Sequence, residues 1–179
     1  SGNLYLAGDF NGEVNFAKAY EGTDLIISSG NSDIFLTKIN PDGTYGYTKS
    51  FGGSGEDKIS SIIHDQDNNI YLTGNFFGTV DFGKACGISD QKTSLGSSDI
   101  FIIKISSNGT SGYIKTFGGA GADFSNSIAS DSLNNIFLTG SFEQTVNFGE
   151  ALLLTEERIS SGESDIFMLN LSSSGDFGW

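Results

Sequence analysis

Residues 98–105 read Ser-Asp-Ile-Phe-Ile-Ile-Lys-Ile, and this stretch decides the fold. Closely similar stretches occupy residues 32–39 and 164–171, so the pattern recurs every 66 residues. Its apolar side chains follow one another without alternating with polar ones. A strand of this kind is typically covered on both faces. The sequence therefore predicts β-sheets that stack against copies of themselves.

The repeat extends outward from these stretches over the whole chain. Residues 3–8 (Asn-Leu-Tyr-Leu-Ala-Gly) return as 69–74 and 135–140, and aligning residues 3–68 with 69–134 gives 33 identities in 66 positions without a gap. Self-similarity at a fixed period is the signature of a repeat architecture. We expect one segment, residues 1–179, made of units at approximately 3–68, 69–134 and 135–179, the last incomplete.

Each unit is predicted to contain four strands, A to D, bounded by Gly, Asn, Asp and Ser. Strand A is expected around 59–64 and 125–130, and strand B in the Leu-Tyr-Leu or Ile-Phe-Leu segments that end at Gly8, Gly74 and Gly140. Strand C begins at Asp33, Asp99 and Asp165, and strand D covers 47–51 and 113–117. The Asp-Gly and Asn-Gly pairs between C and D favour a two-residue hairpin turn.

A four-stranded antiparallel meander that must be covered on both faces is typical of a β-propeller blade. A β-helix needs shorter rungs, and a sandwich gives no reason for a long repeat. We predict an all-β partial ring of about 2.7 blades, with the remaining blades supplied by the parent chain or by other chains. Phe35, Phe101 and Phe167 are expected to be buried between blades, because large aromatics at a fixed phase belong to the core.

The combined pattern resembles the SBBP family of bacterial β-propeller repeats. It comprises Gly-Asn-Ile/Leu-Tyr-Leu-Ala/Thr-Gly, Gly-Thr-Val-Asp-Phe-Gly, Ser-Asp-Ile-Phe-Leu/Ile-x-Lys-Ile and Phe-Gly-Gly-x-Gly-x-Asp, and it covers essentially the whole chain. The third copy departs from it at Asn170, where the others have Lys38 and Lys104. The resemblance implies a large bacterial surface or secreted protein, and it supports the fold more than any activity.

Composition narrows the possible functions. The formal net charge is -13, so nucleic acid and anionic membrane surfaces are expected to be repelled. One cysteine, Cys86, and one histidine, His64, exclude a disulfide within the chain and a multi-histidine metal centre. We expect no cofactor, no metal site and no enzyme activity. No signal peptide or membrane-spanning segment is recognisable, and the chain reads as an excerpt of a longer protein.

The recurring acidic residues have two interpretations. Asp33, Asp99 and Asp165, and likewise Asp57 and Asp123, could be metal ligands, but carboxylates in turns more often accept backbone N–H groups. Residues 65–69 (Asp-Gln-Asp-Asn-Asn) superficially suggest a calcium loop, yet the copy at 131–135 has Leu133 in place of the second ligand. A turn is favoured for each of them.

Two classes of function remain. The first is a noncatalytic extracellular or cell-surface scaffold that binds an unknown protein or glycan through the connections between strands B and C, residues 17–31, 83–97 and 149–163. The second is a carbohydrate-binding or glycan-processing propeller, which the lack of a recurrent Trp disfavours. Loops that differ on a rigid scaffold commonly carry binding, although drift in unconstrained surface loops gives the same pattern. The candidate binding residues are Tyr20, Glu21, Asp24, Asp90, Lys92, Glu156 and Arg158.

Overall fold

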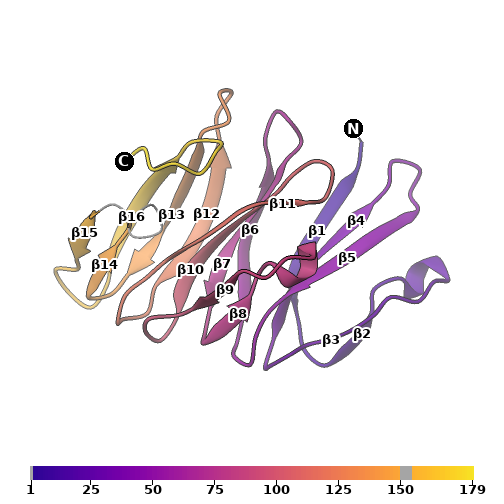
Figure 1. Ribbon diagram of the computed structural model, residues 1–179, viewed down its shortest axis with the longest axis horizontal. Helices are drawn as coiled ribbons and strands as arrows, with labels where there is room; N and C mark the ends of the chain where they lie inside the picture. Colours follow the sequence, from indigo (N-terminus) through magenta and orange to yellow (C-terminus); the bar gives the residue numbers. More distant parts are fainter. Residues whose placement is uncertain (1, 150–154) are drawn as a thin grey trace.

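A computed structural model describes residues 2–149 and 155–179. Three antiparallel sheets follow one another across the molecule in chain order (Figure 1). The first sheet contains β1 (Leu4–Phe10), β4 (Asp33–Ile39) and β5 (Tyr45–Phe51), in that order. These are the predicted strands B, C and D of the first unit.

The central sheet has all four predicted strands. It consists of β6 (Lys58–His64), β7 (Ile70–Phe76), β10 (Asp99–Ile105) and β11 (Ser111–Phe117), paired in the order β11-β10-β7-β6. The third sheet pairs β12 (Phe124–Ser130), β13 (Ile136–Phe142) and β16 (Asp165–Leu171), and beyond it Leu171 forms an isolated bridge with Phe177. The four-stranded meander is therefore confirmed for the central sheet, whereas the outer two have three strands each.

Register follows the period of the sequence. Gly74 lies opposite Phe101, as Gly8 lies opposite Phe35 and Gly140 opposite Phe167. A Cβ atom on Gly74 would stand 2.8 Å from the Phe101 ring and 1.9 Å from the carbonyl oxygen of Lys58. Each strand B continues for two residues beyond the glycine at which the sequence predicted its end, and this glycine makes room for the phenylalanine of strand C.

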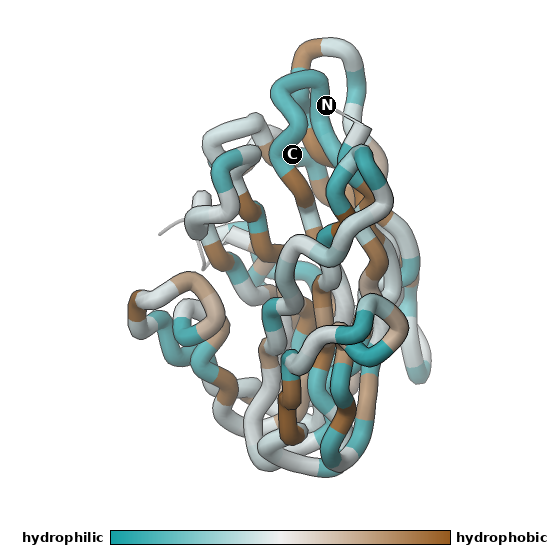
Figure 2. The backbone as a smooth tube through the Cα atoms, turned by 90° about the vertical axis from the view of Figure 1, so that its right-hand side faces the viewer, coloured by the Kyte–Doolittle hydropathy of each residue, from teal (hydrophilic) through white to brown (hydrophobic). Residues whose placement is uncertain are grey.

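The core consists of two layers between the sheets. One lies between the first and central sheets and includes Leu36, Leu72 and Phe101, and the other, between the central and third sheets, includes Ile100 and Phe167. In the side view, hydrophobic stretches run along the interior strands, and many turns are hydrophilic (Figure 2). Strands β7 and β10 are buried on both faces, as predicted.

One of the three equivalent phenylalanines differs from expectation. Phe101 is fully buried and Phe167 is 9% exposed, but Phe35 is only partly buried. Each of these rings packs toward the preceding sheet, and no described sheet lies on that side of β4. The contact of Phe35 with Phe16 recurs as Phe82–Phe101 and Phe148–Phe167, so Phe35 lacks only the cover of a preceding sheet.

The turn between strands C and D was also predicted incorrectly. The amide of Gly43 donates to the Asn40 carbonyl and that of Asn40 to the Thr44 carbonyl, which closes a three-residue loop instead of a two-residue one. Only the glycine, with φ of +82°, has a positive φ, and the Asp42 carboxylate accepts the Thr44 amide. This is the geometry of a turn followed by a glycine bulge.

The connections between strands B and C fold into short hairpins, which the sequence did not predict. They pair β2 (Glu13–Asn15) with β3 (Leu25–Ile27), β8 (Thr79–Asp81) with β9 (Gln91–Thr93), and β14 (Thr145–Asn147) with β15 (Glu157–Ile159). The first two contain a single 3-10 turn, η1 (Lys18–Tyr20) and η2 (Lys84–Cys86). Among the described residues no helix is long and apolar enough to span a membrane.

Candidate functional site

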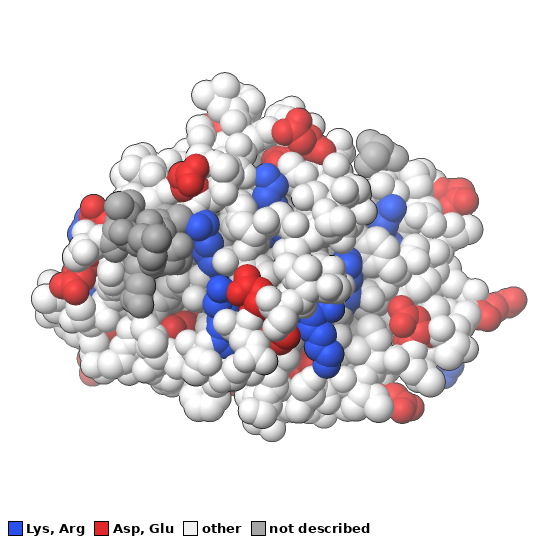
Figure 3. Space-filling view, viewed as in Figure 1, with Lys and Arg blue, Asp and Glu red and all other residues white. Residues whose placement is uncertain are grey.

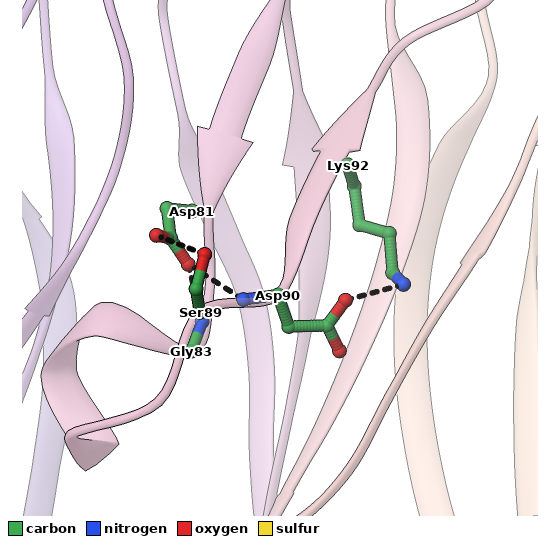
Figure 4. Close-up of polar contacts among 5 residues, drawn as sticks. All are labelled: Asp81, Gly83, Ser89, Asp90 and Lys92. Atoms are coloured by element: carbon green, nitrogen blue, oxygen red, sulfur yellow. Dashed lines mark hydrogen bonds and ion pairs between the residues drawn. The ribbon is translucent and has the colours of Figure 1, made fainter.

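The candidate site is the end of the sheets that carries the three hairpins. Each hairpin is closed by a side chain at the end of its first strand. In the second hairpin, the Asp81 carboxylate accepts the amides of Gly83 at 3.2 Å and Asp90 at 2.8 Å, and the Ser89 hydroxyl at 3.1 Å (Figure 4). These hydrogen bonds hold the pKa of Asp81 below its usual value.

The other hairpins use asparagine for the same purpose. Asn15 Oδ1 accepts the amides of Ala17 and Asp24, and Asn147 Oδ1 accepts those of Gly149 and Glu156. These side-chain hydrogen bonds were not predicted from the sequence. The signal was an Asn or Asp recurring at positions 15, 81 and 147.

In the first hairpin, the predicted residues contact strand β5. The Tyr20 ring lies 5.7 Å from that of Tyr45, whose hydroxyl donates to the Asp24 carboxylate. Burial, and then the hydrogen bond to Asp24, raises the pKa of Tyr45 to about 12. Glu21 is exposed and caps η1 with a φ of 58°.

In the other two hairpins, the predicted residues form ion pairs within their own hairpin. Lys92 Nζ lies 2.6 Å from Asp90 Oδ1 (Figure 4), and an Arg158 nitrogen lies 3.3 Å from Glu156 Oε2. Part of the predicted segment 149–163, residues 150–154, lies outside the described residues. The structure therefore distributes the seven predicted residues over three hairpins and does not gather them into one cluster.

The glycine-rich turns between strands D and A lie between neighbouring hairpins. Gly53 forms a bridge with Val80, and the amide of Asn31 donates to the Gly55 carbonyl at 3.0 Å. The next copy repeats the bridge between Gly119 and Val146. Hairpins and turns thus form one surface, as the strand order predicts.

The buried carboxylates of this surface bind backbone amides. Asp57 is fully buried and accepts the amides of Gly53 and Phe77, and Asp123 accepts the equivalent pair. Burial raises the pKa of Asp57 to about 6 and also raises that of Asp123. Through these hydrogen bonds, the two carboxylates connect each turn between strands D and A to the start of the next hairpin.

The remaining recurring acids have similar roles. Asp33, Asp99 and Asp165 each accept the amide of the residue four positions earlier. At the opposite end of the sheets, Asp65 accepts the amides of Asp67 and Asn69. Burial opposes ionisation of Asp65, but these bonds, with those from the Asn69 side chain and the Tyr71 hydroxyl, hold its pKa below its usual value. The described residues contain no group of three or more His, Cys, Asp or Glu suited to a metal ion.

His64 and Cys86 lie outside any catalytic arrangement that the structure describes. His64 is exposed at the end of β6, with Nδ1 3.1 Å from the Asp65 carbonyl oxygen. Cys86 is a partly buried free thiol in η2.

The sheets, their register and the repeated turns define an all-β repeat protein of the β-propeller type. Residues 112–141 match the model of the SBBP family, which is described as a beta-propeller repeat. The resemblance seen in the sequence is therefore confirmed for residues 112–141. The match spans β11, β12 and most of β13, so it crosses from one sheet to the next. No curated protein matches the chain.

Proposed function

We propose that this segment is a noncatalytic interaction module of a larger extracellular or cell-surface bacterial repeat protein, and that its hairpins bind the partner. One observation carries the proposal. The recurring acids at the strand ends and glycine-rich turns, Asp33/Asp99, Asp57/Asp123 and Asp65/Asp131, accept backbone amides. The hairpins instead display side chains most of which differ between copies. The framework and the variable surface are thus separate parts of each unit.

The hairpins present different chemistry from a common scaffold. The first displays Tyr20 and Glu21, the second the Asp90–Lys92 pair, and the third the Glu156–Arg158 pair. Binding residues are commonly placed on loops held by a rigid framework. The net charge of -13 makes nucleic acid an unfavourable partner.

Exchanges between hairpins test this function. Segment 83–97 is replaced by 17–31, which has the same length, and the other two segments are exchanged in the same way. Arrays of extracellular proteins and of glycans then compare each exchange with the parent. We expect an unchanged melting temperature and altered binding. Asn108→Asp is the matched control, because it introduces the residue that the first copy has at Asp42, at the opposite end of the sheets.

Two results would contradict the proposal. Equal binding of the same ligand by the parent and by all three exchanges would remove the hairpins from the interface. Turnover of chromogenic glycosides would instead indicate the glycan-processing alternative. Binding on the glycan array alone, if it changes with the hairpin, identifies the partner as a carbohydrate.

A further inference from the structure

A groove recurs at the same place in the first and central sheets. In the first, it is lined by Leu25–Ile27 of β3 and by residues 48–50 of β5, and it has a volume of about 560 Å³. In the central sheet, it is lined by Gln91–Thr93 of β9 and by residues 114–116 of β11, and its volume is about 300 Å³. These lining positions are 66 residues apart, so the groove belongs to the repeat.

The lining residues show that each groove runs along strand edges. Side chains of successive strand residues point to opposite faces, so a sheet face would contribute every second residue. Here, three consecutive residues of each strand line the groove. Within the described part of the chain, β3 pairs only with β2, β5 only with β4, and the same holds for β9 and β11. Both strand edges that border each groove are unpaired.

The backbone of the hairpin strand directs hydrogen-bonding groups into the groove. The Ser28 amide donates to the Gly12 carbonyl, and the Asp24 carbonyl accepts the Phe16 amide, so both bonds face the β2 side of the hairpin. Because bonding alternates along an antiparallel strand, the N–H and C=O groups of Leu25 and Ile27 point away from β2. The bonds of Ser94 and Asp90 to the β8 hairpin give Gln91 and Thr93 the same orientation.

Two further features favour a single extended chain as the occupant. The next hairpin forms the second wall, where Lys49 Nζ donates to the Ala85 carbonyl at 2.7 Å. Because the groove has a wall on each side, it leaves no room for the further strands that a folded sheet would bring with its edge strand. Asp33, 2% exposed, also lines the first groove, and its buried Oδ1 has no hydrogen-bond partner among the described residues. A peptide amide would satisfy it.

We propose that each groove binds an extended peptide segment of a partner protein, which adds as a strand along the free edge of β3 or β9. Main-chain hydrogen bonds to Leu25 and Ile27, or to Gln91 and Thr93, provide the attachment. The side chains that line each groove select among sequences. This inference rests on the proposed interaction function and specifies its partner.

The test removes one amide from each groove without touching the hairpin's own pairing. Proline is tolerated on an edge strand where its missing N–H faces outward. The test variant is therefore Ile27→Pro/Thr93→Pro. Its control is Ile27→Ala/Thr93→Ala, which keeps both amides. The probe is an immobilised library of peptides of about ten residues, long enough to span a typical strand. Melting temperatures and circular dichroism verify that both variants are folded.

We expect the parent and the alanine variant to bind the same peptides, and the proline variant to bind them about tenfold or more weakly, since hydrogen bonds are lost and the ring occupies the edge. Two N-methylated forms of the best peptide are also compared, one methylated at the odd-numbered amides and the other at the even-numbered amides. Because only one of these sets faces the hairpin strand, at least one of the two forms is expected to lose binding.

The proposal is overturned if no peptide binds, if the proline variant binds as well as the alanine variant, or if both N-methylated registers still bind. Glycan binding that the proline variant loses would also overturn it. Should peptides fail while hairpin exchanges still alter partner binding, the interaction function stands and only the peptide assignment is lost.

Discussion

Asp57 shows how a buried carboxylate makes stability depend on pH. Its pKa is about 6 in the folded chain, mainly through burial, against roughly 3.9 in an unfolded chain. Between these values the folded state retains a proton that the unfolded state has lost, so stability falls as pH rises. We expect the unfolding free energy of the parent, relative to Asp57→Asn, to fall by about 2 kcal/mol from pH 4 to 6. Urea titrations of both proteins measure this difference, and a flat or rising difference would contradict it.

Gly53 lies where the neighbouring backbone leaves no room for a side chain. A Cβ atom there would lie 2.1 Å from the carbonyl oxygen of Thr79, which belongs to the next hairpin. We expect Gly53→Ala to destabilise the chain by about 1–3 kcal/mol, as overpacking does. Gly162→Ala is the control, because no atom lies within 4 Å of its Cβ position. Thermal unfolding compares the two, and equal melting temperatures would show that the turn adjusts freely.

Among the elements, the hairpin closed by Asp81 allows a sharp comparison. Asp81→Ala leaves the Asp90 amide without its acceptor, whereas Asp81→Asn reproduces the residue found at Asn15 and Asn147. We expect the Asp90 amide to exchange with deuterium about tenfold faster in the alanine variant, because one net hydrogen bond is lost. The asparagine variant is expected to match the parent. Parent-like protection in the alanine variant would mean that the strands alone hold the hairpin.

The same elements show which parts of the structure the sequence could predict. Strands such as β7 and β10 were predictable because burial on both faces favours apolar residues at consecutive positions, as in residues 70–72 and 100–103. The hairpins were not predicted, since β3, β9 and β15 have only three residues each and read Leu-Ile-Ile, Gln-Lys-Thr and Glu-Arg-Ile. They share no apolar pattern, and side-chain and backbone hydrogen bonds hold them.

The candidate binding site was predictable in position only. In an antiparallel meander, the connections from B to C and from D to A leave the sheet at the same end. The order of the strands therefore placed the hairpins and the glycine-rich turns at one end of the sheets, where the structure has them. The partners of Tyr20, Asp24 and Lys92 depend on how each hairpin folds back, which the sequence pattern does not specify. The charge distribution depends on this folding too: lysine side chains gather across the middle of one face, around η2 and β9, with acidic side chains among them (Figure 3).

At the scale of the whole molecule, the outward face of the third sheet differs from its copy in the central sheet. Ile166 is 88% and Met168 59% exposed, whereas the equivalent Ile100 and Ile102 are fully buried by the third sheet. Leu4 and Leu6 of β1 are likewise exposed at the other end of the molecule. Apolar side chains gathered on one surface mark an interface, so we expect another sheet of the same kind to cover each face.

Because these apolar faces are exposed, we expect the segment to self-associate when it is studied alone. We expect light scattering to show species larger than a monomer, and the double variant Ile166→Lys/Met168→Lys to shift the distribution toward monomer while the melting temperature stays nearly unchanged, because substitutions at exposed positions cost little. Ile100→Lys is the control: the same change at the buried copy places a charge in the core and is expected to unfold the segment. A parent segment that remains monomeric and binds no hydrophobic dye would show that these faces need no cover, because an exposed apolar face attracts both other copies and the dye.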